Sequence, residues 1–234
     1  HSSSYRRAES DLEDLKEKGV LNNIPKRSTL NDYANDINIF RLIEKLIQLS
    51  SKFFLDNEDT LIIDSTWFGL RMYSGGYRKV YDKKSTSLEK CRKLHIAVAK
   101  NSKVITCAKA TAGTAHDSPI FKKLVRRTVK NGFKITDVLA DAGYCSKDNY
   151  SLCKELGIRN VFIDFRSNIT GKRAKSDIWR EQIKMYKENN EIWHDYYRFR
   201  VVIEGVFSAI KRKNNNYLRS KRKISRFTEL LLKA

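Results

Sequence analysis

The first part of the chain carries apolar residues at helical spacing. Residues 5–20 predict one helix, and apolar positions between residues 30 and 54 predict a second, long helix with a broad hydrophobic face. Ser28 or Thr29 is expected to cap its start. The apolar face contains Ile37, Ile39, Phe40, Leu42, Ile43, Leu46, Ile47 and Leu49. An N-terminal helical segment is therefore expected over residues 1–58, either as a brace on the main domain or as a DNA-binding or dimerising element.

The pattern changes after residue 58 to short apolar runs of the kind found in β-strands. Strands are predicted at residues 61–63, 94–99, 104–110, 135–140 and 160–165, with a turn at residues 100–103. Helices are predicted at residues 117–131, 146–156 and 196–213, the last one after a polar stretch around residues 166–195. Three consecutive strands favour an antiparallel start, and the later strand–helix alternation favours parallel additions.

This order predicts an α/β fold over residues 59–234, in which a mixed sheet is flanked by helices on both faces. It is the order of elements in the ribonuclease H-like fold. In such sheets, side chains at the ends of adjacent strands converge on one edge, where functional sites usually form.

Charge is the most informative feature of the composition. The chain has 47 Lys and Arg residues against 27 Asp and Glu residues, for a net charge of +20. Residues 1–60 hold 9 basic and 11 acidic side chains, whereas residues 61–234 hold 38 and 16. A positive field of this size in one region indicates a polyanionic partner, most simply nucleic acid. No apolar run approaches the roughly 20 residues of a spanning helix, so no membrane association is expected. The near-neutral N-terminal segment favours the brace.

The four cysteines favour a reducing compartment. Cys91, Cys107, Cys145 and Cys153 lack the spacing of a zinc site or a disulfide framework, and the N-terminus lacks a signal-peptide pattern. Cys107 and Cys145 lie within or beside apolar runs, where free thiols behave as small core residues. A cytoplasmic location is expected.

Three acidic residues occupy informative positions. Asp64 closes the first predicted strand, Asp141 follows the fourth, and Glu204 lies within the last helix. Carboxylates brought together at a sheet edge can share hard cations, and a pair of cations about 4 Å apart can assist phosphoryl transfer. The alternative is that each aspartate merely ends a strand or caps a helix. Two aspartates that each directly follow an apolar strand favour the functional interpretation.

The last helix carries a polar stripe. Tyr197, Arg200, Glu204 and Lys211 fall within an arc of about 60° on a regular helix. The opposite side is apolar and is expected to pack on the sheet through Val202, Ile203, Val206, Phe207 and Ile210. The stripe suits a metal ligand flanked by phosphate-binding cations, or an ordinary solvated face with i,i+4 charge pairs.

These motifs resemble those of a known family. The spacing Tyr197-x2-Arg200-x3-Glu204-x6-Lys211 is similar to the Tyr-Arg-Glu-Lys signature of DDE transposases from bacterial and archaeal insertion sequences. Four further segments resemble the same family, namely LIIDST at 61–66, GTAHDSP at 113–119, VLADAGY at 138–144 and FRSN at 165–168. The similarity covers about residues 60–230.

The resemblance implies a DNA transposase that hydrolyses phosphodiesters at the element's ends and transfers the freed 3′-hydroxyl into target DNA. Asp64, Asp141 and Glu204 would be the catalytic residues and the ligands of Mg²⁺, with Mn²⁺ as a substitute and two ions expected. Arg200 and Lys211 would contact DNA phosphates, and Tyr197 would position the strand. Double-stranded DNA, a homodimer on that DNA, and a prokaryotic, nucleoid-associated location are implied.

Several neighbouring residues have two possible roles. His116 would approach the scissile phosphate or fill a loop, while Asp117 is expected to be a helix N-cap. Trp67 and Phe68 would stack on an unpaired base, or at least one of them would pack in the core. The remaining basic residues, Arg212, Lys213 and the segment 219–226, are expected to follow the DNA backbone or to form a solvated tail.

Three other readings of the chain remain open. A nuclease or resolvase of the same fold would keep the three acids without the signature helix. A non-catalytic or domesticated DNA-binding protein derived from a transposase, or a basic structural protein, would explain the charge. The N-terminal segment lacks a clear helix-turn-helix pattern, and the chain ends on an apolar run, as a fragment of a longer enzyme would.

Overall fold

The computed structural model describes residues 5–70, 91–165, 177–188 and 190–234. The strands are β1 (Thr60–Leu70), β2 (Cys91–Ala99), β3 (Ile105–Ala112), β4 (Asp137–Ala140), β5 (Asn160–Ile163) and β6 (Tyr217–Leu218). The helices are α1 (Tyr5–Glu17), α2 (Arg27–Asn35), α3 (Ile37–Ser51), α5 (Ser118–Lys130), α6 (Lys147–Glu155), α7 (Asp177–Glu188), α8 (Asn190–Tyr197), α9 (Val201–Asn214) and α10 (Lys223–Lys233). Short 3₁₀ turns are η1 (Lys52–Phe54), η2 (Ala142–Tyr144) and η3 (Arg198–Arg200).

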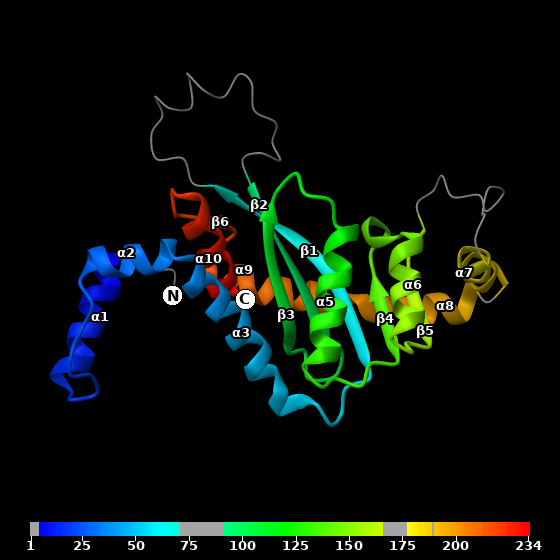
Figure 1. Ribbon diagram of the computed structural model, residues 1–234, viewed down its shortest axis with the longest axis horizontal. Helices are drawn as coiled ribbons and strands as arrows, with labels where there is room; N and C mark the ends of the chain where they lie inside the picture. The colour runs from blue at the N-terminus through cyan, green and yellow to red at the C-terminus, as the bar shows by residue number, and fades with distance from the viewer. Residues whose placement is uncertain (1–4, 71–90, 166–176, 189) are drawn as a thin grey trace, which may run out of the picture.

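The strands form one mixed sheet in the order β3-β2-β1-β4-β5, and β6 pairs with the far end of β1. β1, β2 and β3 are antiparallel neighbours, whereas β4 and β5 are added in parallel. Helices cover both faces (Figure 1). The expected ribonuclease H-like mixed α/β fold is confirmed.

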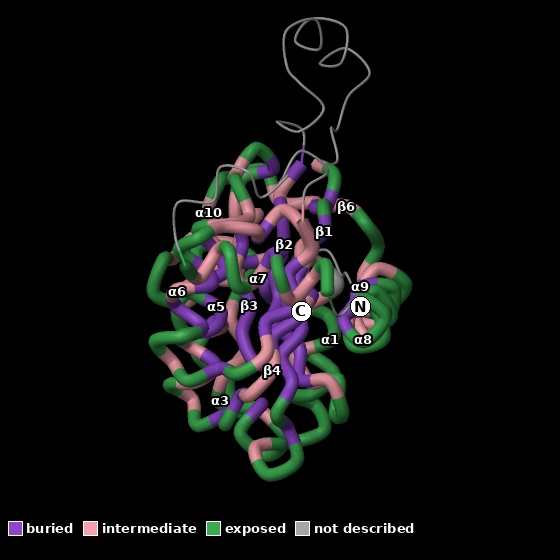
Figure 2. The backbone as a smooth tube through the Cα atoms, turned by 90° about the vertical axis from the view of Figure 1, so that its right-hand side faces the viewer, coloured by how far each residue is buried: buried purple, intermediate pink, exposed green. Residues whose placement is uncertain are grey.

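Side-chain alternation along β1 divides the core into two layers. Leu61 and Ile63 point toward α5 and α6, while Ile62 and Phe68 point toward α3, α9 and α10. All four side chains are fully buried, and the sheet forms the buried centre of the molecule in Figure 2. A strand buried on both faces reads as a continuous apolar run, which is why residues 61–63 lack polar alternation.

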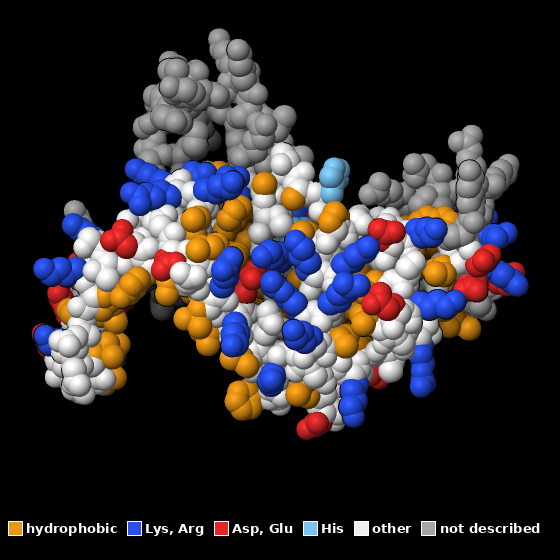
Figure 3. Space-filling model, viewed as in Figure 1, with side chains coloured by type: hydrophobic (Ala, Val, Ile, Leu, Met, Phe, Trp, Pro, Cys, Tyr) orange, Lys and Arg blue, Asp and Glu red, His pale blue; other side chains and the backbone are white. Residues whose placement is uncertain are grey.

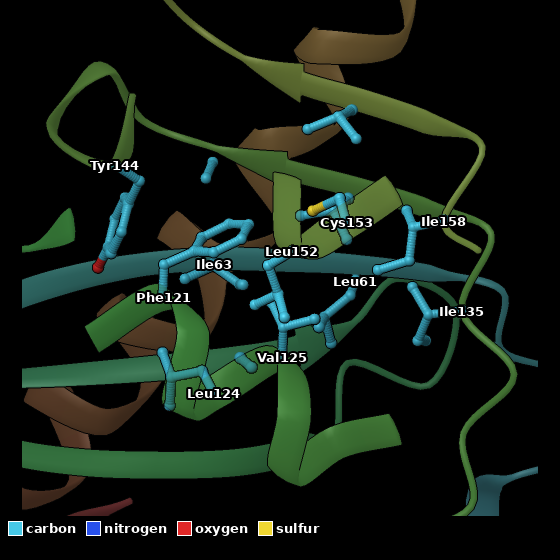
Figure 4. Packing of buried hydrophobic residues seen from close by; sticks show 14 of the residues in the cluster. Leu61, Ile63, Phe121, Leu124, Val125, Ile135, Tyr144, Leu152, Cys153 and Ile158 are labelled. Atoms are coloured by element: carbon cyan, nitrogen blue, oxygen red, sulfur yellow. The ribbon is translucent and has the colours of Figure 1, made fainter. Parts of the chain in front are cut away.

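The first layer depends mainly on α5. Its buried residues recur at helical spacing, and Figure 4 shows three of them against β1 and α6: Phe121, Leu124 and Val125. α5 ends before Gly132, whose φ of 108° is a conformation that favours glycine. On the other face, α9 contributes Ile203, Phe207 and Ile210, which are buried as expected.

The structure corrects three expectations about the helices: the extent of one helix, its cap, and the nature of the polar stretch before the last helix. The long helix after residue 30 is two helices, because Asp36 is extended and its side chain caps α3 by accepting from the Asn38 N–H. Lys26 occupies the N-cap position of α2 without a side-chain cap, so the Ser28 or Thr29 cap was wrong. The polar stretch before the last helix contains α7 and α8, whose amphipathic pattern was missed.

Candidate active site

Asp64 and Asp141 lie side by side at the end of the parallel β1–β4 ladder. The last pair of that ladder is Ile63 with Ala140, and each aspartate is the next residue. Asp141 follows β4 as expected, but β1 continues through Asp64 to Leu70, so the expectation that Asp64 closes the first strand was wrong. Continued pairing with β2 keeps this part of β1 extended.

Each aspartate is oriented by the backbone that follows it. Asp64 Oδ1 accepts from the Ser65 N–H at 2.7 Å, and Asp141 Oδ1 accepts from the Ala142 N–H at 2.7 Å. Asp141 is therefore also the N-cap of η2. A local N–H bond fixes one oxygen of each carboxylate and leaves the second oxygen for another partner.

Arg200 links Asp64 to Glu204. Its Nη1 lies 2.7 Å from Asp64 Oδ2, and its Nη2 lies 3.2 Å from Glu204 Oε1. The Glu204 side chain is 56% exposed and that of Asp64 is 15% exposed, so the pair spans the surface and the interior of the site. Lys211 also reaches β1, where its Nζ donates to Thr66 Oγ1 at 2.6 Å.

The predicted polar stripe is only partly one helical face. The chain enters α9 through η3, so Tyr197 belongs to α8 and Arg200 to η3. Tyr197 stacks on Trp193 with ring centroids 4.6 Å apart, and the Arg200 guanidinium lies 5.8 Å from the Tyr197 ring centroid. The structure therefore brings Tyr197, Arg200 and Glu204 together across a break in the predicted helix.

Burial dominates the electrostatics of Asp64. Desolvation raises the pKa of this carboxyl to about 6, although the Ser65 N–H and the Arg200 guanidinium favour the charged form. The neighbouring charges of Asp141 and Asp117 raise the pKa further. Asp64 thus lies near two other carboxylates, and a bound cation would favour its ionised form.

The carboxylate oxygens of Asp64 and Asp141 are the ligand type that Mg²⁺ prefers. Their donor chemistry and their placement on adjacent strands fit a divalent cation. Among the residues that the structure describes, however, no three His, Cys, Asp or Glu side chains are grouped closely enough to hold a metal. Glu204 is held by Arg200 in this arrangement, so two of the three predicted ligands are brought together directly.

Asp117 lies on the opposite face of the sheet from Asp64. Asp117 occupies the expected N-cap position of α5, but its backbone is helical and its side chain makes no capping hydrogen bond. The carboxylate instead pairs with Lys93 Nζ at 2.8 Å and accepts from Ser65 Oγ at 3.3 Å. A Cβ at Gly143 would lie 3.0 Å from Asp117 Oδ2, which explains a glycine in the loop that follows Asp141.

His95 and Tyr144 lie with Asp117 on the α5 side of the sheet. His95 is fully buried, with Nδ1 3.2 Å from Tyr144 Oη and Nε2 2.9 Å from Thr111 Oγ1. Burial lowers the pKa of His95 to about 4, against the opposing effect of Asp117. Sequence reasoning missed Lys93 and His95, although two polar residues at i,i+2 in an apolar strand were a usable signal.

The remaining predicted site residues lie at the surface. His116, Arg212 and Lys213 are exposed, and no contact assigns them a role. Phe68 is buried and Trp67 is 48% exposed, which confirms that at least one of the pair packs in the core. The Trp67 ring is covered by Lys93 Nζ at 4.8 Å from its centroid. Residues 166–168 of the FRSN segment lie outside the described residues.

A comparison with protein-family models identifies the family of this chain. The profile described as “Transposase DDE domain” matches residues 56–234, well over half of the chain. The chain belongs to the DDE transposase family. No curated protein matches it. Within the described part of the transposase chain, no helix is both long and apolar enough to cross a membrane.

Three solved structures give a weaker likeness. The simian T-cell lymphotropic virus intasome complexed with a PP2A regulatory subunit has 12% identity and a TM-score of 0.35, covering 75% of this chain and 48% of that chain. The Drosophila P element transposase strand transfer complex has 18% identity and a TM-score of 0.33, covering 65% and 37%. The Mos1 transposase paired-end complex has 9% identity and a TM-score of 0.31, covering 85% and 74%. The present chain thus spans less than half the length of the first two of these chains. Likeness at this level assigns no role to its residues.

Proposed function

We propose that this chain is the catalytic domain of an insertion-sequence transposase of the Tyr-Arg-Glu-Lys group, which cleaves DNA at element ends and joins the 3′-hydroxyl to target DNA. The observation that carries the proposal is the adjacency of Asp64 and Asp141 at the end of the β1–β4 ladder in a DDE transposase domain. Arg200 and Lys211 reach the same strand from the η3–α9 segment.

Asp64 and Asp141 would hold Mg²⁺, or Mn²⁺ as a substitute, with Glu204 completing the ligand set and two ions expected. When bound, such ions activate the attacking oxygen and stabilise the leaving oxygen of phosphoryl transfer. Arg200 and Lys211 would contact phosphates near the cut, with Tyr197 beside them. The exposed residues His116, Arg212 and Lys213 would extend the contact along double-stranded DNA, and the enzyme would act as a homodimer in the prokaryotic cytoplasm.

Mn²⁺ binding and plasmid nicking test this proposal. Electron paramagnetic resonance titration should show Mn²⁺ binding that falls about tenfold or more in Asp141→Asn, because a carboxylate ligand is lost. The matched control is Asp148→Asn, which removes an exposed carboxylate of α6. Supercoiled plasmid should be nicked with Mn²⁺ by the wild type and by Asp148→Asn, but not by Asp141→Asn or Glu204→Gln.

The same experiment separates the non-catalytic alternative. Glu204→Gln should bind plasmid DNA as the wild type does while failing to nick it. Equal Mn²⁺ binding by wild type and Asp141→Asn, together with DNA binding and no nicking, would replace the proposal with a DNA-binding protein derived from a transposase.

A further inference from the structure

α3 exposes a row of large apolar side chains on its outer side. Leu42, Leu46, Leu49 and, just beyond α3, Phe53 are 49%, 53%, 42% and 89% exposed. Their spacing of four, three and four residues is that of a coiled-coil seam. Glu44, on the opposite side of the helix, is buried against the sheet, so α3 packs inward with one face and leaves an apolar face outside. Contiguous apolar surface of this kind marks an interaction site.

The charges beside this seam define the partner. Arg41, Lys45 and Lys52 border it on one flank, are exposed, and form no ion pair within the described part of the chain. Glu44 is the only acidic residue of α3, and it is occupied by Lys109 at 2.7 Å and Arg127 at 3.1 Å. The matching surface is therefore an amphipathic helix with acidic residues beside its apolar row.

α1 has these properties. Ala8, Leu12 and Leu15 recur at intervals of four and three, and Leu15 is 38% exposed. Its acidic residues are Glu9, Asp11, Glu13, Asp14 and Glu17. α1 packs on α2 and projects from the body as an arm (Figure 1). Figure 3 shows hydrophobic side chains both on this arm and over the neighbouring α3 region.

We propose that α1 of a second copy of this chain lies along the α3 seam, and that the two copies exchange these arms reciprocally. The interface would pair Leu12 and Leu15 of one copy with Leu46 and Leu49 of the other. An antiparallel α3–α3 contact is disfavoured, because it would bring the Arg41, Lys45 and Lys52 flanks of both copies together. This interface goes beyond the proposed function, since it requires neither DNA nor metal.

Sedimentation velocity of the whole chain tests the apolar contact. The wild type should be a dimer at low salt whose dissociation constant rises with salt, because opposite charges flank the seam. Leu46→Gln should raise the dissociation constant by about a hundredfold or more, since each dimer uses the seam twice. The matched control is Leu232→Gln, which changes a 67% exposed leucine of α10 and should leave the dimer intact. Circular dichroism shows whether each variant is folded.

A charge exchange identifies the occupant of the seam. Lys45→Glu with Lys52→Glu should weaken the dimer, and adding Asp11→Lys with Asp14→Lys in the same chain should restore it. A chain that stays monomeric at low salt overturns the proposal. So does a dimer that tolerates Leu46→Gln, or one that the second pair of changes does not restore. A dimer that Lys45→Glu with Lys52→Glu strengthens also overturns it and would indicate an α3–α3 contact, because these changes remove the repulsion between two basic flanks.

Discussion

The buried imidazole of His95 predicts a specific dependence of stability on pH. In the folded protein it is neutral, because burial lowers its pKa to about 4 from an ordinary value near 6.5. A group whose pKa is lowered by folding contributes stability that is present above the unfolded pKa and is lost as pH falls toward the folded pKa. The relevant window is therefore about pH 6.5 down to about pH 4.

The magnitude follows from the width of that window. A shift of about 2.5 pKa units corresponds to about 3 kcal/mol, of which about 2 kcal/mol should be lost between about pH 7.5 and pH 5. The charged groups that face His95 are Asp117 and Lys93, whose effects on the imidazole oppose each other. Tyr144, whose pKa burial raises well above its ordinary value, is uncharged throughout this range.

Asp64 works in the opposite direction. Its pKa is raised by folding to about 6, so its contribution is present at low pH and is lost as pH rises through about 6. The wild-type curve alone therefore mixes two opposing titrations. The contribution of Asp64 is present in both the wild type and His95→Gln, so it cancels when the two are compared. Glutamine can hydrogen-bond to Tyr144 and Thr111 without titrating, so the remaining difference reports the titration of His95.

The assay is urea unfolding of both proteins in chelator over this pH range. The wild type should lose about 2 kcal/mol relative to His95→Gln on going from about pH 7.5 to pH 5. Parallel stability curves for the two proteins would refute the reasoning, since they would mean that His95 binds its proton equally well in the folded and unfolded states.

Two further substitutions test the carboxylates of Glu44 and Asp117. Glu44→Gln should cost about 3 kcal/mol of unfolding free energy in urea, because it leaves Lys109 and Arg127 without their shared partner, whereas Asp148→Asn at an exposed pair should cost less than about 1 kcal/mol. Equal costs would mean that burial does not strengthen the first pair. Asp117→Asn should lower plasmid nicking with Mn²⁺ by about tenfold to a hundredfold, since Asp117 positions Ser65 next to Asp64. Unchanged nicking by a folded Asp117→Asn protein would leave that aspartate only a structural role.

The sheet was predictable because its strands are strongly patterned. Runs such as 61–63 and 135–140 are apolar and bounded by turn residues, so their type and order followed from local sequence. The same local logic failed at Asp36 and at η3, where breaks in the helices arise without a proline or glycine to mark them. Polar residues of α7 and α8 hid two helices, because the periodic positions there are aromatic and sparse.

The adjacency of Asp64 and Asp141 was also predictable, since parallel neighbours end at the same edge. Asp117 was not. Its position before α5 predicts a cap, but Lys93 is buried in β2 and requires a counter-charge, and Asp117 is the carboxylate within reach. Local capping preference is worth about 1 kcal/mol, whereas leaving a buried ammonium unpaired costs several times more, so the tertiary partner wins.

The contacts of Arg200 were also only partly predictable from local sequence. Helical projection placed Arg200 and Glu204 together, and they are paired, but projection could not reveal that Asp64, distant in sequence, would accept the other nitrogen. A guanidinium holds two carboxylates in a planar, directional way that a lysine at this position would not reproduce. Its position between a partly buried carboxylate and an exposed one makes Arg200 the link between the interior of the site and its surface. A phosphate and these two carboxylates would use the same N–H donors, so the role of Arg200 depends on what else the carboxylates bind.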